Sequence, residues 1–223
     1  QHNQQFKKTT IMFISMVFMN NLIHKKFILA SSSASRYKIL KNMKLNFNQI
    51  NPVCDEEVIK KNIKTKKTNP IYLVKKLSYE KAKSVSQLKK NQLVVGCDTV
   101  IYFEKEILDK ARSKKEAVKK ITKLSGKKHK IYSAITIFKN EKKIWQCYDS
   151  SEVSIRKMSK NEISLYLNQC GKQILNSVGC YQVETLGPTI INNITGDLFN
   201  IMGFPLFKFL KYLRGEKWKS FML

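Results

Sequence analysis

The chain has 223 residues, 43% of them hydrophobic, which is enough for one medium domain with a buried core and excludes disorder throughout. Its net charge of +26 suggests a nucleic-acid partner, but only four of the 42 basic residues are arginines, and the lysines lie in every segment. Because arginine dominates base and phosphate recognition, nucleic-acid binding is not expected, and the pattern favours a solvated basic surface that would attract a polyanion such as a triphosphate.

The N-terminal segment "KKTTIMFISMVFM" (7–19) has a basic start and a short apolar run, like a weak signal peptide. The run is too short to span a bilayer, so no membrane association is expected. We interpret residues 1–20 as an extension, disordered or not native, that precedes a single domain over residues 21–223.

A short strand is expected at 26–30, followed by "SSSASRYKIL" (31–40), which turns into an amphipathic helix. The loop at the start of this helix offers hydroxyls and free backbone N–H groups, which attract anions, and Arg36 adds a bidentate phosphate donor. The following segment, 46–58, is typical of a second strand that ends in an acidic loop.

Capping signals place most of the remaining helices. Asn69 and Pro70 predict a helix to about Leu88, and a buried strand is expected at 93–103. After a turn at 104–106, a capping box at Ser113/Glu116 predicts a helix to about Leu124, and a second box at Ser159/Glu162 predicts a helix to about Gln169. Between these helices, a long antiparallel hairpin is expected from 129–139 and 144–158. Short strands at 179–184 and 189–194 and a last helix from near Pro205 complete the expected elements.

Strands and helices therefore interleave, with some antiparallel hairpins and no internal repeat. This pattern predicts a mixed α/β domain in which a long curved mixed sheet, flanked by helices, divides two lobes. The five cysteines are odd in number and contain no CxxC pair, and the three histidines form no ligand pattern. We therefore expect neither a disulfide framework nor a zinc cluster, and we expect a reducing, cytoplasmic location.

Two acidic features could carry chemistry. Asp55, Glu56 and Glu57 stand together in a chain with only 16 acids, and their oxygens could hold a hard divalent cation, although adjacent carboxylates are more often simply solvated. Asp98 interrupts the apolar strand "LVVGCDTVIY" (93–102) near its expected C-terminal end. An isolated buried carboxylate is costly, so Asp98 is the strongest candidate for a functional residue.

Several motifs in order resemble the Maf family of nucleoside triphosphate pyrophosphatases. They are "ILASSSASRYKIL", "DEE", "LSYEKAKSV", "VVGCDTVIYFEKEILDKA", "LSGKKHKIYSAITI", "SVGCYQVETLG" and "ITGDLFNIMGFPL". The resemblance covers roughly residues 26–213 and is greatest to Maf-like proteins of α-proteobacteria. It implies a fold shared with inosine triphosphate pyrophosphatases, and hydrolysis of a nucleoside triphosphate to a monophosphate and pyrophosphate with Mg²⁺, Mn²⁺ or Co²⁺. It also implies a possible homodimer.

The resemblance also implies roles for single residues. Asp98 matches the family's catalytic aspartate, described as the proton acceptor and a candidate metal ligand. Ser33 and Arg36 fall on its phosphate-binding first loop, and Lys81 and Lys110 match its two motif lysines. Either Glu56 or Glu57 falls on its acidic, metal-binding loop.

Base preference is ambiguous by the same comparison. Ser35 occupies the diagnostic position of the first loop with neither of the family's usual residues. Thr99 resembles the group that acts on dTTP and UTP, whereas Glu184 resembles the group that acts on 7-methyl-GTP. A carboxylate at Glu184 could accept both N–H donors of a guanine edge, but a solvent-facing strand residue is an equally good interpretation.

Three rival interpretations remain at this level. The charge alone allows a basic nucleic-acid-binding module, and the family's link to arrest of septum formation allows a regulatory interaction protein. An inosine or xanthosine triphosphate pyrophosphatase would share the fold, but the "SSSASR" and "GCDTV" motifs favour Maf.

Overall fold

The computed structural model describes residues 26–63 and 69–215. The predictions about the extension at 1–20 and its apolar run lie outside these residues. Within them, no helix is both long and apolar enough to cross a membrane.

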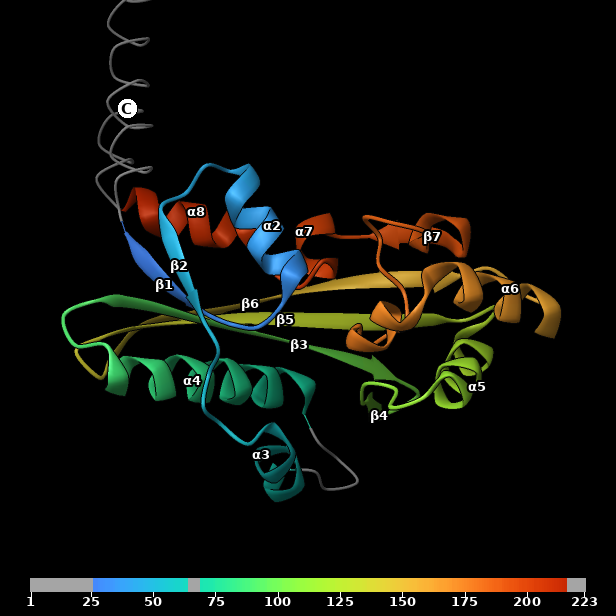
Figure 1. Cartoon of the computed structure of the whole chain (residues 1–223), viewed down its shortest axis with the longest axis horizontal. Coiled ribbons are helices and arrows are strands. Elements are labelled where there is room, and N and C mark those ends of the chain that lie inside the picture. Colours follow the sequence, from blue (N-terminus) through green and yellow to red (C-terminus); the bar gives the residue numbers. More distant parts are fainter. Residues whose placement is uncertain (1–25, 64–68, 216–223) are drawn as a thin grey trace, which may run out of the picture.

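A seven-stranded mixed sheet forms the centre of the fold, in the order β2-β1-β3-β5-β6-β7 with β4 paired to β3 (Figure 1). β1 is parallel to β2 and β3, whereas all other pairs are antiparallel. The strands are β1 (Phe27–Ala30), β2 (Phe47–Ile50), β3 (Leu93–Phe103), β4 (Glu106–Leu108), β5 (Lys128–Lys139), β6 (Lys142–Ile155) and β7 (Ile191–Thr195). The mixed α/β prediction with a long sheet flanked by helices is thus confirmed.

Helices cover both faces of this sheet. Figure 1 shows α4 along one face, α2, α7 and α8 on the other, and α5 and α6 at one end. The helices are α2 (Ala34–Asn42), α3 (Glu56–Ile63), α4 (Pro70–Leu88), α5 (Lys114–Leu124), α6 (Lys160–Cys170), α7 (Leu198–Ile201) and α8 (Leu206–Arg214), with 3-10 turns η1 (Lys172–Asn176) and η2 (Gly187–Thr189).

The two largest groups of buried side chains lie toward opposite ends of the sheet, and two smaller groups lie under α4. Around Phe27, Val95 and Phe209, aromatic and aliphatic residues pack between the sheet and helices α2 and α8. A second large group, around Ile121, Val153 and Leu167, packs under α5 and α6 at the other end of the sheet. The long strands β3, β5 and β6 run through both groups and join them.

β3 alternates its side chains between the two faces, as a strand must. Gly96 and Asp98 face α4, while Cys97 and Thr99 face the side of α2 and α8. One edge of β3 pairs with β1 only as far as Gly96, and with β4 only from Ile101 onward. No strand of the described residues covers that edge at 97–100, so side chains from both faces of the sheet can reach the same space.

Local sequence signals explain most elements. Asn69 caps α4 with Pro70 in its first turn, and Ser159 and Glu162 form a complete capping box on α6. At Ser113 the box is half formed: its hydroxyl caps α5, but the Glu116 carboxylate accepts from Arg112 N instead.

One expected strand, at 179–184, is wrong, and two others form with different bounds. The second strand ends at Ile50, and the acidic residues after it begin α3, because Asp55 Oδ1 accepts hydrogen bonds from Glu57 N and Val58 N and so caps that helix. At 179–184 the chain turns instead of extending, with Cys180 at a φ of +55°. The strand predicted at 189–194 is confirmed as β7, which begins at Ile191 and ends at Thr195.

Close packing of α4 on β3 predicts that Gly96→Ala destabilises the fold. The added methyl group would lie 2.5 Å from Ala82 N and 2.7 Å from Ala82 Cβ, against helix backbone that cannot yield. We expect a loss of about 3 kcal/mol in the free energy of unfolding, measured by urea titration with an unchanged m-value. At the control position Gly215, where an added methyl group would meet no atom of the described non-neighbouring residues within 4 Å, alanine should lose only about 1 kcal/mol from its positive φ. Equal losses in the two variants would contradict this packing argument.

Candidate active site

A cleft of about 460 Å³ opens beside the uncovered edge of β3. Its walls come from the loop and first turn of α2, from α3 and α4, and from the segment 176–184. Four cationic side chains and three carboxylates line it; they are Arg36, Lys60, Lys81, Lys110, Glu56, Asp98 and Glu184. The cleft lies just beyond the carboxyl end of β1, where ligands of α/β sheets commonly bind.

Arg36 is buried, yet neutral acceptors hold its guanidinium. Nε donates to Gly203 O at 2.8 Å, Nη1 to Ser31 Oγ at 3.1 Å and Nη2 to Thr99 Oγ1 at 2.9 Å. Among the described residues no carboxylate pairs with it. The guanidinium is therefore fixed in place while its charge stays available to an anionic ligand.

A chain of hydroxyl groups supports the contact between Arg36 and Thr99. Ser133 Oγ donates to Asn200 O at 2.9 Å, so its oxygen accepts the Thr99 proton, also at 2.9 Å. The oxygen of Thr99 is then left to accept from Arg36. Thr99, predicted to read the base, thus has its hydroxyl engaged with the arginine.

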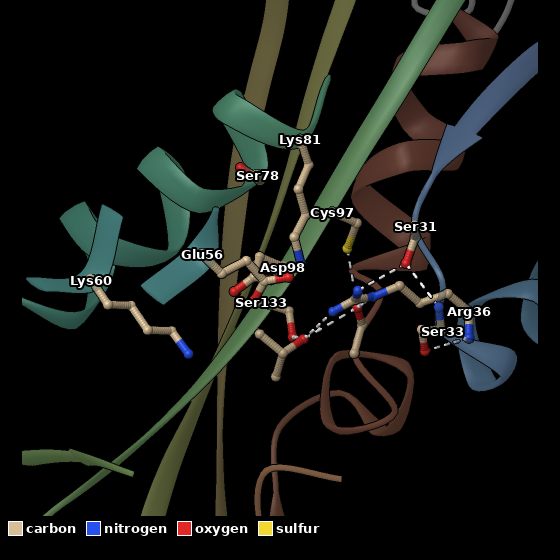
Figure 2. A network of polar contacts seen from close by, with 12 residues as sticks. Ser31, Ser33, Arg36, Glu56, Lys60, Ser78, Lys81, Cys97, Asp98 and Ser133 are labelled. Carbon is tan, nitrogen blue, oxygen red and sulfur yellow. Dashed lines mark hydrogen bonds and ion pairs between the residues drawn. The ribbon is translucent and has the colours of Figure 1, made fainter. Parts of the chain in front are cut away.

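The ammonium of Lys81 joins the two carboxylates on the α4 side of the sheet (Figure 2). Lys81 Nζ forms a buried ion pair with Asp98 Oδ1 and lies 2.8 Å from Glu56 Oε1. Burial alone would raise the pKa of Asp98, but the charges of Lys81 and Arg36 outweigh it and hold that pKa below its usual value. Asp98 is therefore ionised at neutral pH. Asp98 lies in the middle of β3, not near the C-terminal end of the strand as the sequence suggested.

The acidic residues of α3 point in different directions. Glu56 faces the cleft, whereas Glu57 extends toward Arg112. Glu57 Oε1 lies 2.7 Å from Arg112 Nη2, and the side chains of Glu57 and Arg112 are largely exposed. Successive residues on a helix are about 100° apart, so both carboxylates cannot face one site. Of the three predicted metal ligands, the structure brings Glu56 and Asp98 together and leaves Glu57 outside the cleft.

Lysines complete the α3 side of the cleft. Lys110 follows β4, and partial desolvation in the cleft lowers its pKa, an effect that Glu56 opposes and Lys81 reinforces. Lys60, to which the sequence assigned no role, lies one helical turn after Glu56 and also lines the cleft.

The opposite wall joins two residues predicted to read the base. Ser35 Oγ donates to Glu184 Oε1 at 2.6 Å, which links the first turn of α2 to the segment 176–184. This segment is anchored from beneath by Tyr181, whose hydroxyl lies 2.6 Å from His129 Nε2 on β5. Ser33, predicted to bind phosphate, caps α2 by accepting from Arg36 N at 3.4 Å and lines the same cleft.

Asp98 and Glu56 also meet the chemistry of a hard divalent cation. Mg²⁺ and similar ions are bound by one or two carboxylates together with substrate phosphates and water. In the described ranges, this cleft included, no group of three or more His, Cys, Asp and Glu side chains is suited to hold a metal alone. Two carboxylates on one ammonium therefore fit an ion that arrives with a phosphorylated ligand.

Comparisons with known proteins identify the family of the chain. The profile of the family described as Maf-like protein matches residues 26–216. The chain belongs to the Maf family. Its sheet and the cleft residues all lie within the matched range.

Individual relatives cover nearly the same span. A "7-methyl-GTP pyrophosphatase" of Bartonella quintana is 42% identical over 84% of this chain and 93% of its own length. A "nucleoside triphosphate pyrophosphatase" of Caulobacter vibrioides is 34% identical over 83% and 93%. A "dTTP/UTP pyrophosphatase" of Aquifex aeolicus is 34% identical over 84% and 93%. The first two come from α-proteobacteria, and none of the three names describes a nucleic-acid-binding or septum protein.

Three contributors to the site were not assigned from the sequence. Ser31 holds Arg36, the carbonyl of Gly203 accepts from it, and Lys60 lines the cleft. Lys60 could have been found if 56–63 had been interpreted as a helix, because it is four residues after Glu56 and shares its face. A backbone carbonyl such as Gly203 O gives no signal in side-chain chemistry.

The buried pair predicts that Lys81→Met destabilises the protein in a pH-dependent way. Without the ammonium, Asp98 and Glu56 lose their shared cation, so we expect a loss of about 3 kcal/mol at pH 7. In the native protein the pKa of Asp98 is lower than in the unfolded chain, where it is near 4, so the ionised carboxylate stabilises the fold above that pH. This stabilisation is lost as the pH falls through the pKa of the folded state. In the variant that pKa rises, so the difference between the two proteins should shrink as the pH falls from 7 to 4.

Urea unfolding at several pH values measures this difference. Lys83→Met, at a half-exposed position of the same helix, is the matched control and should change stability little at any pH. A loss in Lys81→Met that did not vary with pH would show that Lys81 contributes packing rather than charge.

Proposed function

We propose that this protein is a nucleoside triphosphate pyrophosphatase, which hydrolyses its substrate between the α and β phosphates to a nucleoside monophosphate and pyrophosphate. The observation that carries the proposal is the ionised Asp98, which shares Lys81 with Glu56 on the floor of a cleft that also holds Arg36 and Lys110. Membership of the Maf family and the names of its relatives support the same activity. The substrate class supports a cytoplasmic location.

The cations explain how a triphosphate can bind. The substrate carries nearly four negative charges, and Arg36, Lys81 and Lys110 lie where they offset this charge and that of the leaving pyrophosphate. Free N–H groups in the first turn of α2 add donors for phosphate oxygens. Because Arg36 is already held by neutral acceptors, little reorganisation is needed when the substrate arrives.

The reaction requires a water molecule aligned with the α phosphorus. The bond between the water oxygen and the α phosphorus forms, the bond from that phosphorus to the bridging oxygen breaks, and pyrophosphate leaves. Asp98 accepts the proton of the attacking water, which requires that its carboxylate be ionised. The rigid strand β3 holds this carboxylate in one position.

A divalent metal ion is expected with the substrate, since enzymes of this family generally depend on one. Asp98 and Glu56 would hold it together with phosphate oxygens. When bound, it lowers the pKa of water and neutralises phosphate charge.

Base selection is assigned to Ser35 and Glu184. Ser35 holds one carboxylate oxygen of Glu184, which orients the side chain at the mouth of the cleft. A carboxylate can accept the N1–H and N2–H donors of guanine, whereas thymine and uracil offer a single such donor. The 42% identity to a relative named for 7-methyl-GTP also supports a guanine-type substrate.

Asp98→Asn should keep the fold and lower pyrophosphate release by about 10³-fold, because the carboxamide accepts no proton and is a poor metal ligand. Phosphate-coupled detection of pyrophosphate measures the rate, and circular dichroism checks the fold. The control is Asp149→Asn, which removes a carboxylate paired with Lys208 outside the cleft and should leave the rate unchanged. Activity of Asp98→Asn near wild type would refute the role of Asp98.

Glu184→Gln should lower kcat/KM for 7-methyl-GTP and GTP relative to dTTP and UTP by about tenfold. A carboxamide offers one acceptor and one donor in place of two acceptors, which mismatches the guanine edge. The five triphosphates, including CTP, are compared for pyrophosphate release in wild type and variant. Glu106→Gln serves as the matched control, since Glu106 pairs with Lys123 outside the cleft and its change should leave the ratio unaltered. Faster turnover of dTTP than of the guanine nucleotides by the wild-type enzyme would contradict the assignment.

A further inference from the structure

Lys60 lines the cleft without a part in the chemistry described so far. It lies on α3 four residues after Glu56, so the two side chains project from the same face of the helix. Figure 2 shows Lys60 extending toward Glu56 and Asp98, on the side of them opposite to Arg36. Its charge also acts on Asp98, since it is one of the cations that lower the pKa of that carboxyl.

The partner of Lys60 is a weak one. Its Nζ lies 3.3 Å from Asp109 Oδ1, and the Asp109 side chain is 52% exposed, whereas Lys60 itself is only 21% exposed. An ion pair with so exposed a partner contributes little stability. An ammonium group also has three donors, so a polyanion can share it or replace Asp109 as its partner.

The position of Lys60 indicates which part of a substrate it would meet. Ser35 and Glu184 join at the α2 side of the cleft, and Asp98 lies between that side and α3. A nucleotide with its base at Glu184 and its α phosphate at Asp98 would therefore extend its remaining phosphates toward Lys60.

We propose that Lys60 is a further substrate-binding residue, which exchanges Asp109 for the β and γ phosphates that leave as pyrophosphate. The proposal rests on the proposed function and adds a contact to it. Asp109 is the resting partner that the phosphates displace. Since negative charge develops on the β phosphate as its bond to the α phosphorus breaks, Lys60 also stabilises the leaving group.

Inhibition by two probes tests the proposal in the full-length protein. Inorganic triphosphate contains the phosphates that Lys60 would bind, whereas GMP contains only the α phosphate. We expect Lys60→Gln to raise the inhibition constant of inorganic triphosphate about tenfold and to change that of GMP less than twofold. The matched control is Lys61→Gln, which removes the same charge from an exposed neighbour on α3 and should change neither constant.

Asp109→Asn tests the exchange of partners. The Asp109 carboxylate would compete with the phosphates for Lys60. Its removal should lower the inhibition constant of inorganic triphosphate by about threefold when Lys60 is present, and should have no effect in Lys60→Gln. An equal effect in both backgrounds would show that Asp109 acts through the general field of the cleft and would overturn the exchange.

Other outcomes separate this inference from the proposed function. If Lys60→Gln behaves like Lys61→Gln, or weakens GMP and triphosphate equally, Lys60 does not bind the terminal phosphates. If the wild-type protein releases no pyrophosphate from any triphosphate, the proposed function fails. Calorimetric titration with inorganic triphosphate then still decides whether Lys60 binds it.

Discussion

The buried ion pair between Lys81 and Asp98 is the interaction on which the cleft depends. Two ions removed from water are tolerated only with good geometry and further partners. Here Glu56 is a second partner for Lys81, and the charge of Arg36 favours the ionised form of Asp98. The pair can form because Gly96 and Ala82 let α4 approach β3 closely, which places the lysine directly over the strand. The same pair keeps the carboxylate ionised and joins the sheet to α3, so the packing of one helix sets the chemistry of the floor of the cleft.

The cleft assembles its charges from opposite faces of one sheet. Lys81 and Asp98 belong to the α4 face, and Arg36 with its hydroxyl chain belongs to the face of α2 and α8. They meet because β1 ends at Ala30, opposite Gly96, so the next residues of β3 have no described strand on that edge, although β5 pairs with them on the other. The cationic side chains that a polyphosphate requires are thus brought together without being packed against one another, which limits their mutual repulsion.

Much of this arrangement follows from the sequence, because its strongest signals are local. The bounds of β3 and α4 were predicted from an apolar run and from Asn69 with Pro70, and Arg36, Lys81, Asp98 and Lys110 do line one cleft. Glu57 could not be separated from Glu56 while the acidic residues at the end of 46–58 were interpreted as a loop, since only helical geometry turns the two carboxylates apart. A short strand was predicted at 179–184, but a left-handed residue at Cys180 and hydrogen bonds back to Gln182 O make turns there. Such tertiary choices are not encoded in residue periodicity.

The uncovered stretch of β3 at 97–100 has a further consequence for the solution behaviour of the protein. An exposed strand edge is a place where another chain can add a strand, and natural proteins protect such edges with inward-pointing charges. Here Asp98 and Lys81 lie at that edge, with Arg36, Glu56 and the lysines around it. An invading strand would have to bury these charges without water, which is strongly unfavourable. The residues proposed to hold the substrate therefore also keep another strand from pairing with this short gap in the sheet, in which Cys97, Asp98 and Val100 are almost fully buried.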